Sequence, residues 1–447
     1  MRTANFGNGP FSEEQGEYLK VLMLTTSFPR FQGDSAGVFI QSLCAQLSKR
    51  GHHVTALAPH TADSKRCEDW DGIKVCRFPY FYPFRYQGLC YGSGILSNLK
   101  SSTLAKIQLP LFLLAQTLNA FTVKKRTEFD LVHAHWSFPQ GLAGLMLKGF
   151  SGIPCITTLH GSDMHGLSHP LLRVLNGKII AHSDGCTANS GGTAAVAKKI
   201  SGRDDIHVIP MGVDCRLFAR SPDVDLLKEH RTIGDRIILF AGRFVDQKGI
   251  EYLVMSMPRI LERHPSAKLA LIGSGPVKDK LAFLSRQLGI RDKVIFVNRV
   301  SQWQLARYYS CADVVVLPSI TTDTGEKEGL GLVLLEAMAC GTPVIGTDHG
   351  GIRDIIKEEE TGLLVKERDP EDLALKISRI LAEEALRARL IERGMAFVNA
   401  NFSWDILADK FLSLYQEVVD RSENRTQRRG FASLRRTGRA RDDRRAW

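Results

Sequence analysis

Two glutamates eight residues apart, Glu328 and Glu336, are the first candidates for functional residues in this sequence. Glu328 lies in a glycine-flanked loop after the buried-strand pattern of residues 312–318, and Glu336 lies about one turn into the apolar run that follows. Loops at the carboxyl ends of strands bind ligands in open α/β sheets. Unpaired amides at the helix start, from Gly331 and Leu332 onward, attract phosphate, and a carboxylate accepts two hydrogen bonds from a vicinal diol. The stretch therefore predicts a site for a phosphorylated sugar rather than a solvated helix face.

Two cations in the second half of the chain extend this chemistry. Arg243 and Lys248 follow the strand pattern of residues 236–242 and are five residues apart. On a loop after a strand they could clamp a diphosphate, although two solvated loop charges are the plain alternative. Gly273 opens a second loop of this kind, after the strand pattern of residues 268–272.

The first half of the chain contributes histidines and a glycine loop. His160 follows the strand pattern of residues 154–159, and Asp163 could either orient it or cap the next helix. His133 and His135 share one face of another strand by alternation, and a metal pair there would need a third ligand that is not obvious nearby. Gly37 ends the loop between the first predicted strand and helix, but the G-x-G-x-x-G pattern of dinucleotide-binding proteins is absent.

These motifs resemble those of retaining glycosyltransferases of family 4, the group 1 glycosyltransferases of the exopolysaccharide or lipid-linked glycan type. Glu328 to Glu336 is similar to the E-x7-E motif of that family, and the match continues to Ile345. Met211 and Ala36 depart from the usual residues at two positions. The other matching elements are His160-Gly-Ser-Asp163, Gly242-Arg243 with Lys248-Gly249, and Met211-Gly-Val-Asp214. Over roughly residues 20–420, the resemblance implies the GT-B fold, an α/β architecture of two Rossmann-like doubly wound domains facing a central cleft.

The resemblance also implies roles for the residues. Glu328 would hold the donor sugar and Glu336 the ribose, while Arg243 and Lys248 would stabilise the departing diphosphate without a metal. The implied catalytic group is His160, Glu328, Arg243 and Lys248. The implied donor-binding group is Glu336, Arg243, Lys248, Gly331, Leu332, Gly273 and, beside the base, Val300. The implied acceptor-side group is Gly37, His160, Asp163 and His135.

The resemblance also implies a division of the chain into five segments. The expected segments are an irregular N-terminus at 1–19, an acceptor-binding domain at 20–215, a nucleotide-sugar-binding domain at 216–402, a helix crossing back to the first domain at 403–420, and a basic disordered tail at 421–447.

Charge is spread unevenly over the 447 residues, whose net charge is +11. Residues 1–215 carry +6, residues 216–420 carry −2 and residues 421–447 carry +7. No nucleic-acid-binding motif is present, so this asymmetry favours an anionic membrane surface as the partner. The apolar segment 95–123 ends in three basic residues and is interrupted by Pro110. It is either a pair of helices packed on the sheet or a surface that meets lipid.

The remaining features concern the compartment. Nine cysteines without a C-x-x-C pair indicate reduced thiols, residues 1–20 contain three glutamates and no apolar core, and no apolar run reaches 18 residues. We therefore expect a cytoplasmic enzyme, peripheral at the inner face of the cell membrane. It would move a sugar from a UDP- or GDP-sugar to a glycan or lipid-linked acceptor in cell-surface polysaccharide synthesis. The alternatives are a disaccharide synthase or phosphorylase acting on soluble sugars, and a sugar-nucleotide binding protein without turnover.

Overall fold

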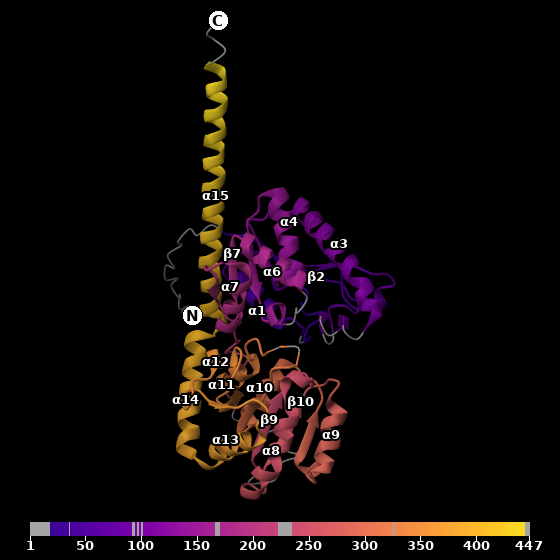
Figure 1. Ribbon diagram of the computed structural model, residues 1–447, viewed down its shortest axis with the longest axis vertical. Helices are drawn as coiled ribbons and strands as arrows, with labels where there is room; N and C mark the ends of the chain where they lie inside the picture. Colours follow the sequence, from indigo (N-terminus) through magenta and orange to yellow (C-terminus); the bar gives the residue numbers. More distant parts are fainter. Residues whose placement is uncertain are drawn as a thin grey trace, which may run out of the picture.

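A computed structural model describes residues 18–442 except 35, 92–93, 96–97, 100–101, 166–169, 222–234, 324 and 326. The segment expected to be irregular at the N-terminus lies outside the described residues, apart from Tyr18 and Leu19. Two α/β domains, built from the first and second halves of the chain, follow one another along the long axis of the molecule (Figure 1).

The first domain is built on a sheet of eight strands in the order β3-β4-β2-β1-β5-β6-β7-β8. The strands are β1 Lys20–Leu24, β2 His53–Pro59, β3 Cys67–Trp70, β4 Ile73–Phe78, β5 Leu131–His135, β6 Cys155–Leu159, β7 Gly185–Ala188 and β8 His207–Val208. All neighbours are parallel except β3, an antiparallel edge strand that its polar sequence did not predict. Strands β5 and β6 are buried along their whole length, as expected for inner strands of a parallel sheet covered on both faces.

The second domain repeats the plan with six parallel strands in the order β11-β10-β9-β12-β13-β14. They are β9 Ile237–Ala241, β10 Lys268–Ile272, β11 Val294–Val297, β12 Val314–Leu317, β13 Val344–Thr347 and β14 Leu363–Val365. The direction of the strand order reverses between β1 and β5 in the first sheet and between β9 and β12 in the second. Two Rossmann-like α/β domains are thereby confirmed, and each has a switch point at which such sheets bind ligands.

Helices cover both sheets. In the first domain they are α1 Val38–Lys49, α3 Thr103–Arg126, α4 Leu142–Ser151, α5 Ser162–His165, α6 Pro170–His182 and α7 Gly191–Ser201. In the second they are α8 Ile250–Arg263, α9 Lys278–Gln287, α10 Gln302–Cys311, α11 Leu332–Ala339, α12 Ile352–Ile355, α13 Pro370–Ala382 and α14 Glu384–Asn401. The last helix, α15 Trp404–Asp442, belongs to both domains.

Helix α3 corrects one expectation, because Pro110 does not interrupt it and Thr103–Arg126 is one continuous helix. Pro110 lies inside this helix on its exposed side, as does Lys106 one turn earlier. The carbonyl that loses its intrahelical partner to a proline can therefore be solvated, which lowers the cost of the break. Among the described residues, α3 is also the one helix long and apolar enough, by length and composition, to cross a membrane. The sequence expectation concerned an unbroken apolar run of 18 residues, and α3 contains none because Lys106, Gln108 and Gln116 lie within it.

Helix α15 joins the domains and continues further than expected. It starts beside the second domain, where Phe402 accepts a hydrogen bond from the Val213 amide at 2.8 Å, and then packs along α1. Phe411 and Tyr415 are fully buried in this contact. The helix then runs on to Asp442 and leaves the body as a long rod (Figure 1), instead of becoming irregular after residue 420. Its continuation has no proline and is rich in arginine, a good helix former.

The hydroxyl of Tyr415 makes a testable contact between α15 and the first sheet. Its Oη lies 2.6 Å from Nδ1 of His133, whose Nε2 lies 2.6 Å from Thr158 Oγ1. Tyr415→Phe leaves a buried imidazole nitrogen unpaired, which typically costs about 1–3 kcal/mol. We expect a lower denaturant midpoint at an unchanged slope, whereas Tyr18→Phe at an exposed position leaves the midpoint unchanged. Equal midpoints for all three proteins would contradict the structural importance of this hydrogen bond.

Candidate functional site

The two sheets bring the predicted site residues to their switch points. In the second domain, Arg243 and Lys248 follow β9, and Ser319 and Glu328 follow its neighbour β12. The carboxyl ends of parallel strands lie at one edge of a sheet, so cations and carboxylate from separate parts of the sequence converge there.

Glu328 has two side-chain partners within this group. Its Oε2 accepts hydrogen bonds from Lys248 Nζ at 2.6 Å and from Ser319 Oγ at 2.8 Å. The Glu328 and Lys248 side chains are only 13% and 15% exposed. Burial by itself raises the pKa of Glu328, but the charge of Lys248 and the two hydrogen bonds outweigh it and lower the pKa below its ordinary value. Glu328 is therefore a carboxylate at neutral pH, able to accept hydrogen bonds from hydroxyl groups.

Glu336 has a different environment. It lies in α11, which begins at Leu332 after the left-handed cap Gly331. Burial raises the pKa of Glu336 to about 7, and the hydrogen bond that Tyr309 Oη donates at 2.9 Å only partly opposes this. Near neutral pH, Glu336 therefore exchanges readily between its two protonation states, and any added hydrogen-bond donor favours the carboxylate.

The other residues predicted to bind the donor sugar nucleotide lie on three different loops of the second domain. Arg243 has an exposed side chain in the loop after β9. Gly273 follows β10, and its amide donates to the Val297 carbonyl at 2.9 Å. Val300 follows β11 at the outer edge of the sheet, two strands from the switch point. The structure therefore joins Lys248 to Glu328 directly, and the base-binding role of Val300 stays a prediction.

In the first domain, His160 sits among aromatic rings. Its ring centroid lies 5.2 Å from that of Phe39 and 4.6 Å from that of Trp136. Its Nε2 lies 3.0 Å from Nδ1 of His135, and the two imidazole rings are stacked. Burial lowers the pKa of His160 to about 3 and the pKa of His135 well below its ordinary value. Both are neutral at physiological pH, so His160 acts there as a hydrogen-bonding group and not as a cation.

Asp163 orients the loop that carries His160. Its two carboxylate oxygens accept hydrogen bonds from the backbone amides of His160 at 3.1 Å and Ser137 at 3.0 Å. Of the two roles left open by the sequence, orientation of the His160 loop is thus the one that the geometry supports. His133 is held by Tyr415 and Thr158, so the two histidines of β5 form a buried wall behind His160.

Gly37 caps α1 at a position that needs glycine. Its φ is 66°, and a Cβ there would lie 2.2 Å from the Ser27 carbonyl oxygen. This contact folds the loop after β1 tightly against the start of α1, at the switch point of the first sheet.

The two domains touch where the predicted catalytic residues lie. A Cβ on Gly329 would lie 2.9 Å from the His160 carbonyl oxygen, and one on Gly161 would lie 3.1 Å from the Gly329 Cα. Asn189 donates to the same His160 carbonyl at 3.2 Å. The loops that carry His160 and Glu328 are therefore in direct backbone contact.

Three residues of the site were missed by sequence reasoning. Ser319 could have been found, because it follows Pro318 at the end of a buried strand. Tyr309 and Asn189 gave no signal, since each reaches its partner only through the tertiary fold.

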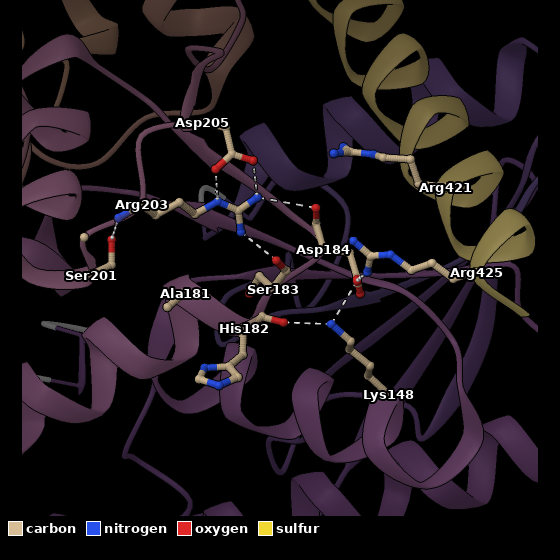
Figure 2. Close-up of a pocket in the computed structure, with 11 residues that line it drawn as sticks. Lys148, Ala181, His182, Ser183, Asp184, Ser201, Arg203, Asp205, Arg421 and Arg425 are labelled. Carbon is tan, nitrogen blue, oxygen red and sulfur yellow. Dashed lines mark hydrogen bonds and ion pairs between the residues drawn. The ribbon is translucent and has the colours of Figure 1, made fainter. Parts of the chain in front are cut away.

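A polar hollow of about 480 Å³ lies at the opposite edge of the first sheet, where α15 passes the ends of α4, α6 and α7 (Figure 2). Asp184 binds Lys148 at 2.9 Å and Arg425 at 3.4 Å, and Arg203 binds Asp205 at 2.7 Å. Of these pairs, Asp184–Arg425 links α15 to the first domain, and the other two lie within that domain. None of them belongs to the site between the domains.

Comparison with known proteins gives the family. The model for Glycosyltransferase Family 4 matches residues 36–217, and the model for Glycosyl transferases group 1 matches residues 225–397. The chain is 30% identical over 351 residues to a D-inositol 3-phosphate glycosyltransferase of Acidothermus cellulolyticus. This match covers 72% of this chain and 75% of that protein.

Solved structures agree in fold. Sucrose-phosphate synthase from Thermosynechococcus elongatus is 26% identical with a TM-score of 0.74, over 90% of this chain and 99% of that one. HepE of Anabaena, in complex with UDP-glucose, is 18% identical with a TM-score of 0.68, over 90% of this chain and all of that one, and shows the fold alone. The chain therefore belongs to the group 1 glycosyltransferases and is a glycosyltransferase built from two Rossmann-like domains.

Proposed function

We propose that this protein is a retaining transferase that moves a sugar from a UDP- or GDP-sugar to a lipid-linked acceptor in cell-surface polysaccharide synthesis. It would work at the cytoplasmic face of an anionic membrane. The observation that carries the proposal is the pairing of Lys248 with Glu328 at one switch point, where the loop of Glu328 touches the His160 loop of the other domain.

The donor would lie along the second domain. Arg243 and Lys248 supply positive charge to the departing diphosphate, so that no divalent cation is required. Glu328, already ionised, accepts hydrogen bonds from sugar hydroxyls, and Glu336 accepts two from the ribose diol. The complex of HepE with UDP-glucose supports a nucleotide-sugar donor.

Transfer would proceed on one face of the sugar. The acceptor hydroxyl oxygen forms its bond to the anomeric carbon as the bond to the phosphate oxygen breaks, and that phosphate oxygen takes the acceptor proton. Neutral His160 positions the sugar by hydrogen bonding, and Asp163 holds its loop in place.

Helix α3 supports a lipid surface as partner, because it exposes aliphatic side chains while two of its glutamines are buried. It buries Gln108 and Gln116 against the domain, each 1% exposed, and presents an aliphatic stripe outward. The stripe, at spacings of three and four residues, is Leu104, Ile107, Leu111, Leu114 and Leu118. Lys124, Lys125 and Arg126 form the last turn. An exposed apolar stripe that ends in cations suits an anionic lipid surface.

A soluble phosphorylated acceptor is the second candidate. It is favoured by the names of two similar proteins, the D-inositol 3-phosphate glycosyltransferase and the sucrose-phosphate synthase. The two candidates differ in whether transfer depends on lipid, so assaying release of nucleoside diphosphate with lipid-linked and with soluble acceptors separates them.

The cation pair gives the first functional prediction. Arg243→Ala and Lys248→Ala each remove a charged group from the departing diphosphate, a loss worth about 3 kcal/mol or at least 100-fold in turnover. We expect that loss with the thermal transition retained, and wild-type activity that persists in EDTA. Lys280→Ala, on an exposed pair with Glu251, serves as the matched control and keeps its rate. Near-normal turnover in both site variants would rule out the clamp.

Glu336 predicts a pH dependence of nucleotide binding. Ribose hydroxyls donate to the ionised form, so affinity is complete above the pKa of about 7 and falls as the pH drops below it. The decrease approaches tenfold per pH unit, because one proton must be released. Calorimetry with UDP and GDP measures it, and Glu336→Gln leaves only the titration of the phosphate itself. The same slope in Glu336→Gln would mean that Glu336 does not contact the ribose.

The stripe on α3 predicts membrane binding. Wild-type protein should float with anionic vesicles at low salt and less well at high salt. Replacing Leu114 and Leu118 together by Gln removes about 2 kcal/mol for each buried leucine and should lower binding at least tenfold. Leu375→Gln, an exposed leucine of the second domain, is the control. Failure to float at low salt refutes the membrane surface, and binding lost on deletion of 421–447 assigns it to α15 instead.

A further inference from the structure

An apolar hollow of about 420 Å³ lies beside α3, between this helix and the segment after β4. Its lining is apolar or aromatic throughout and consists of Pro79, Tyr80, Phe81, Tyr82, Phe84 and Leu111. Tyr82 is 78% exposed and Leu111 is 42% exposed. Leu111 also belongs to the α3 stripe, so the hollow is continuous with the proposed membrane-facing surface.

The walls of the hollow are fixed by hydrogen bonds to the surrounding chain. The Tyr80 amide donates to Gln87 Oε1 at 2.9 Å, and Tyr80 Oη accepts from the Leu89 amide at 3.1 Å. Gln108 of α3 donates to the Tyr86 carbonyl at 2.6 Å. A ligand would therefore meet a preformed site, which reduces the entropic cost of binding.

Two arginines lie near the hollow, Arg66 beside its lining residue Phe84 and Arg85 next to Phe84 in the chain. The Arg66 guanidinium lies 5.7 Å from the ring centroid of Phe84, and the Arg85 guanidinium lies 4.9 Å from that of Tyr86. Both arginines are exposed. An apolar hollow bordered by guanidinium groups complements a hydrocarbon chain that ends in a phosphate.

The same segment leads to the acceptor side of the site. Tyr91 Oη donates to the Phe28 carbonyl at 3.2 Å, and Arg77 donates to the Pro29 carbonyl at 2.8 Å. Phe28 and Pro29 lie in the loop that ends at Gly37, the cap of α1. The segment that lines the hollow is thus tied, through Arg77 before it and Tyr91 after it, to the loop at the switch point of the first sheet.

We propose that this hollow receives the hydrocarbon chain of a phosphorylated lipid acceptor next to its phosphate, with the phosphate at Arg66 and Arg85. The chain would reach it from the membrane along Leu111, and the sugar end would extend toward the Gly37 loop. This inference rests on the proposed function, and it adds a binding subsite for the chain itself.

Direct binding of alkyl phosphates tests the hollow independently of turnover. We would titrate full-length protein with butyl, hexyl and octyl phosphate below their micelle concentrations, with inorganic phosphate and octanol as single-feature probes. Each added methylene should tighten binding about threefold to fourfold. Tyr82→Ser and Leu111→Ser should flatten this dependence, whereas Phe283→Ser and Leu375→Ser, exposed positions of the second domain, should retain it.

Several outcomes would overturn the subsite. In one, octyl phosphate binds no more tightly than inorganic phosphate. In another, both hollow variants keep the wild-type dependence of affinity on chain length. In a third, sedimentation shows a dimer that octyl phosphate does not dissociate, because a second copy of the protein covers the hollow. If octanol bound as tightly as octyl phosphate, the phosphate would contribute nothing to binding. That result would overturn the role proposed for Arg66 and Arg85.

A transfer assay separates this inference from the proposed function. With a long-chain lipid-linked acceptor, Tyr82→Ser and Leu111→Ser should raise KM at least tenfold with kcat unchanged. Transfer to that acceptor with an unchanged KM keeps the function and rejects the hollow. Chain-dependent binding of alkyl phosphates without transfer to any lipid-linked acceptor keeps the hollow and rejects the function.

Discussion

The close backbone approach of Gly161 and Gly329 is the constraint on which the site depends. A Cβ at position 329 would lie within 2.9 Å of the His160 carbonyl oxygen, so a larger residue would push the domains apart at this point. The neighbouring residues in the chain are His160 and Glu328. Glycine therefore sets the distance between a neutral imidazole in one domain and a carboxylate in the other, and α15 holds the domains together from behind.

Within that contact, burial and pairing give the two glutamates different properties. Both carboxyls are removed from water, but only Glu328 has a cation beside it, and its pKa falls while the pKa of Glu336 rises to about 7. A neutral tyrosine hydroxyl cannot replace the charge of Lys248, because a hydrogen bond offsets only part of the lost hydration. Glu328 is thus an ionised acceptor of hydrogen bonds from hydroxyl groups at neutral pH, whereas the protonation of Glu336 depends on whether a ligand is bound.

Sequence reasoning predicted what depends on local pattern. The buried strands and the loops after β9 and β12 follow from apolar runs that end in glycine or proline, and parallel strands bring Lys248 and Glu328 to one edge. Tyr309 and Asn189 were not predicted, because their contacts join residues separated by 27 and 29 positions. The first contact depends on the packing of α10 on α11, and the second on the pairing of β6 with β7. Pro110 was expected to interrupt the apolar segment because a proline normally ends a helix, and sequence does not show that the freed carbonyl faces solvent.

The burial pattern of α3 also bears on how a group 1 glycosyltransferase could meet an insoluble substrate. A helix that packs on a soluble domain normally buries leucine and exposes glutamine, and α3 does the reverse at Gln108 and Gln116. Gln108 donates to the Tyr86 carbonyl and Gln116 accepts from Gln140, but Gln108 Oε1 and Gln116 Nε2 lack a partner among the described residues, so burial satisfies each amide only in part. The orientation of α3 instead places leucines on its outer face, and their exposure is favourable only if an apolar surface covers them. With net charges of +6 on residues 1–215 and −2 on residues 216–420, an anionic surface would draw the first domain toward lipid and leave the second open to water-soluble donors.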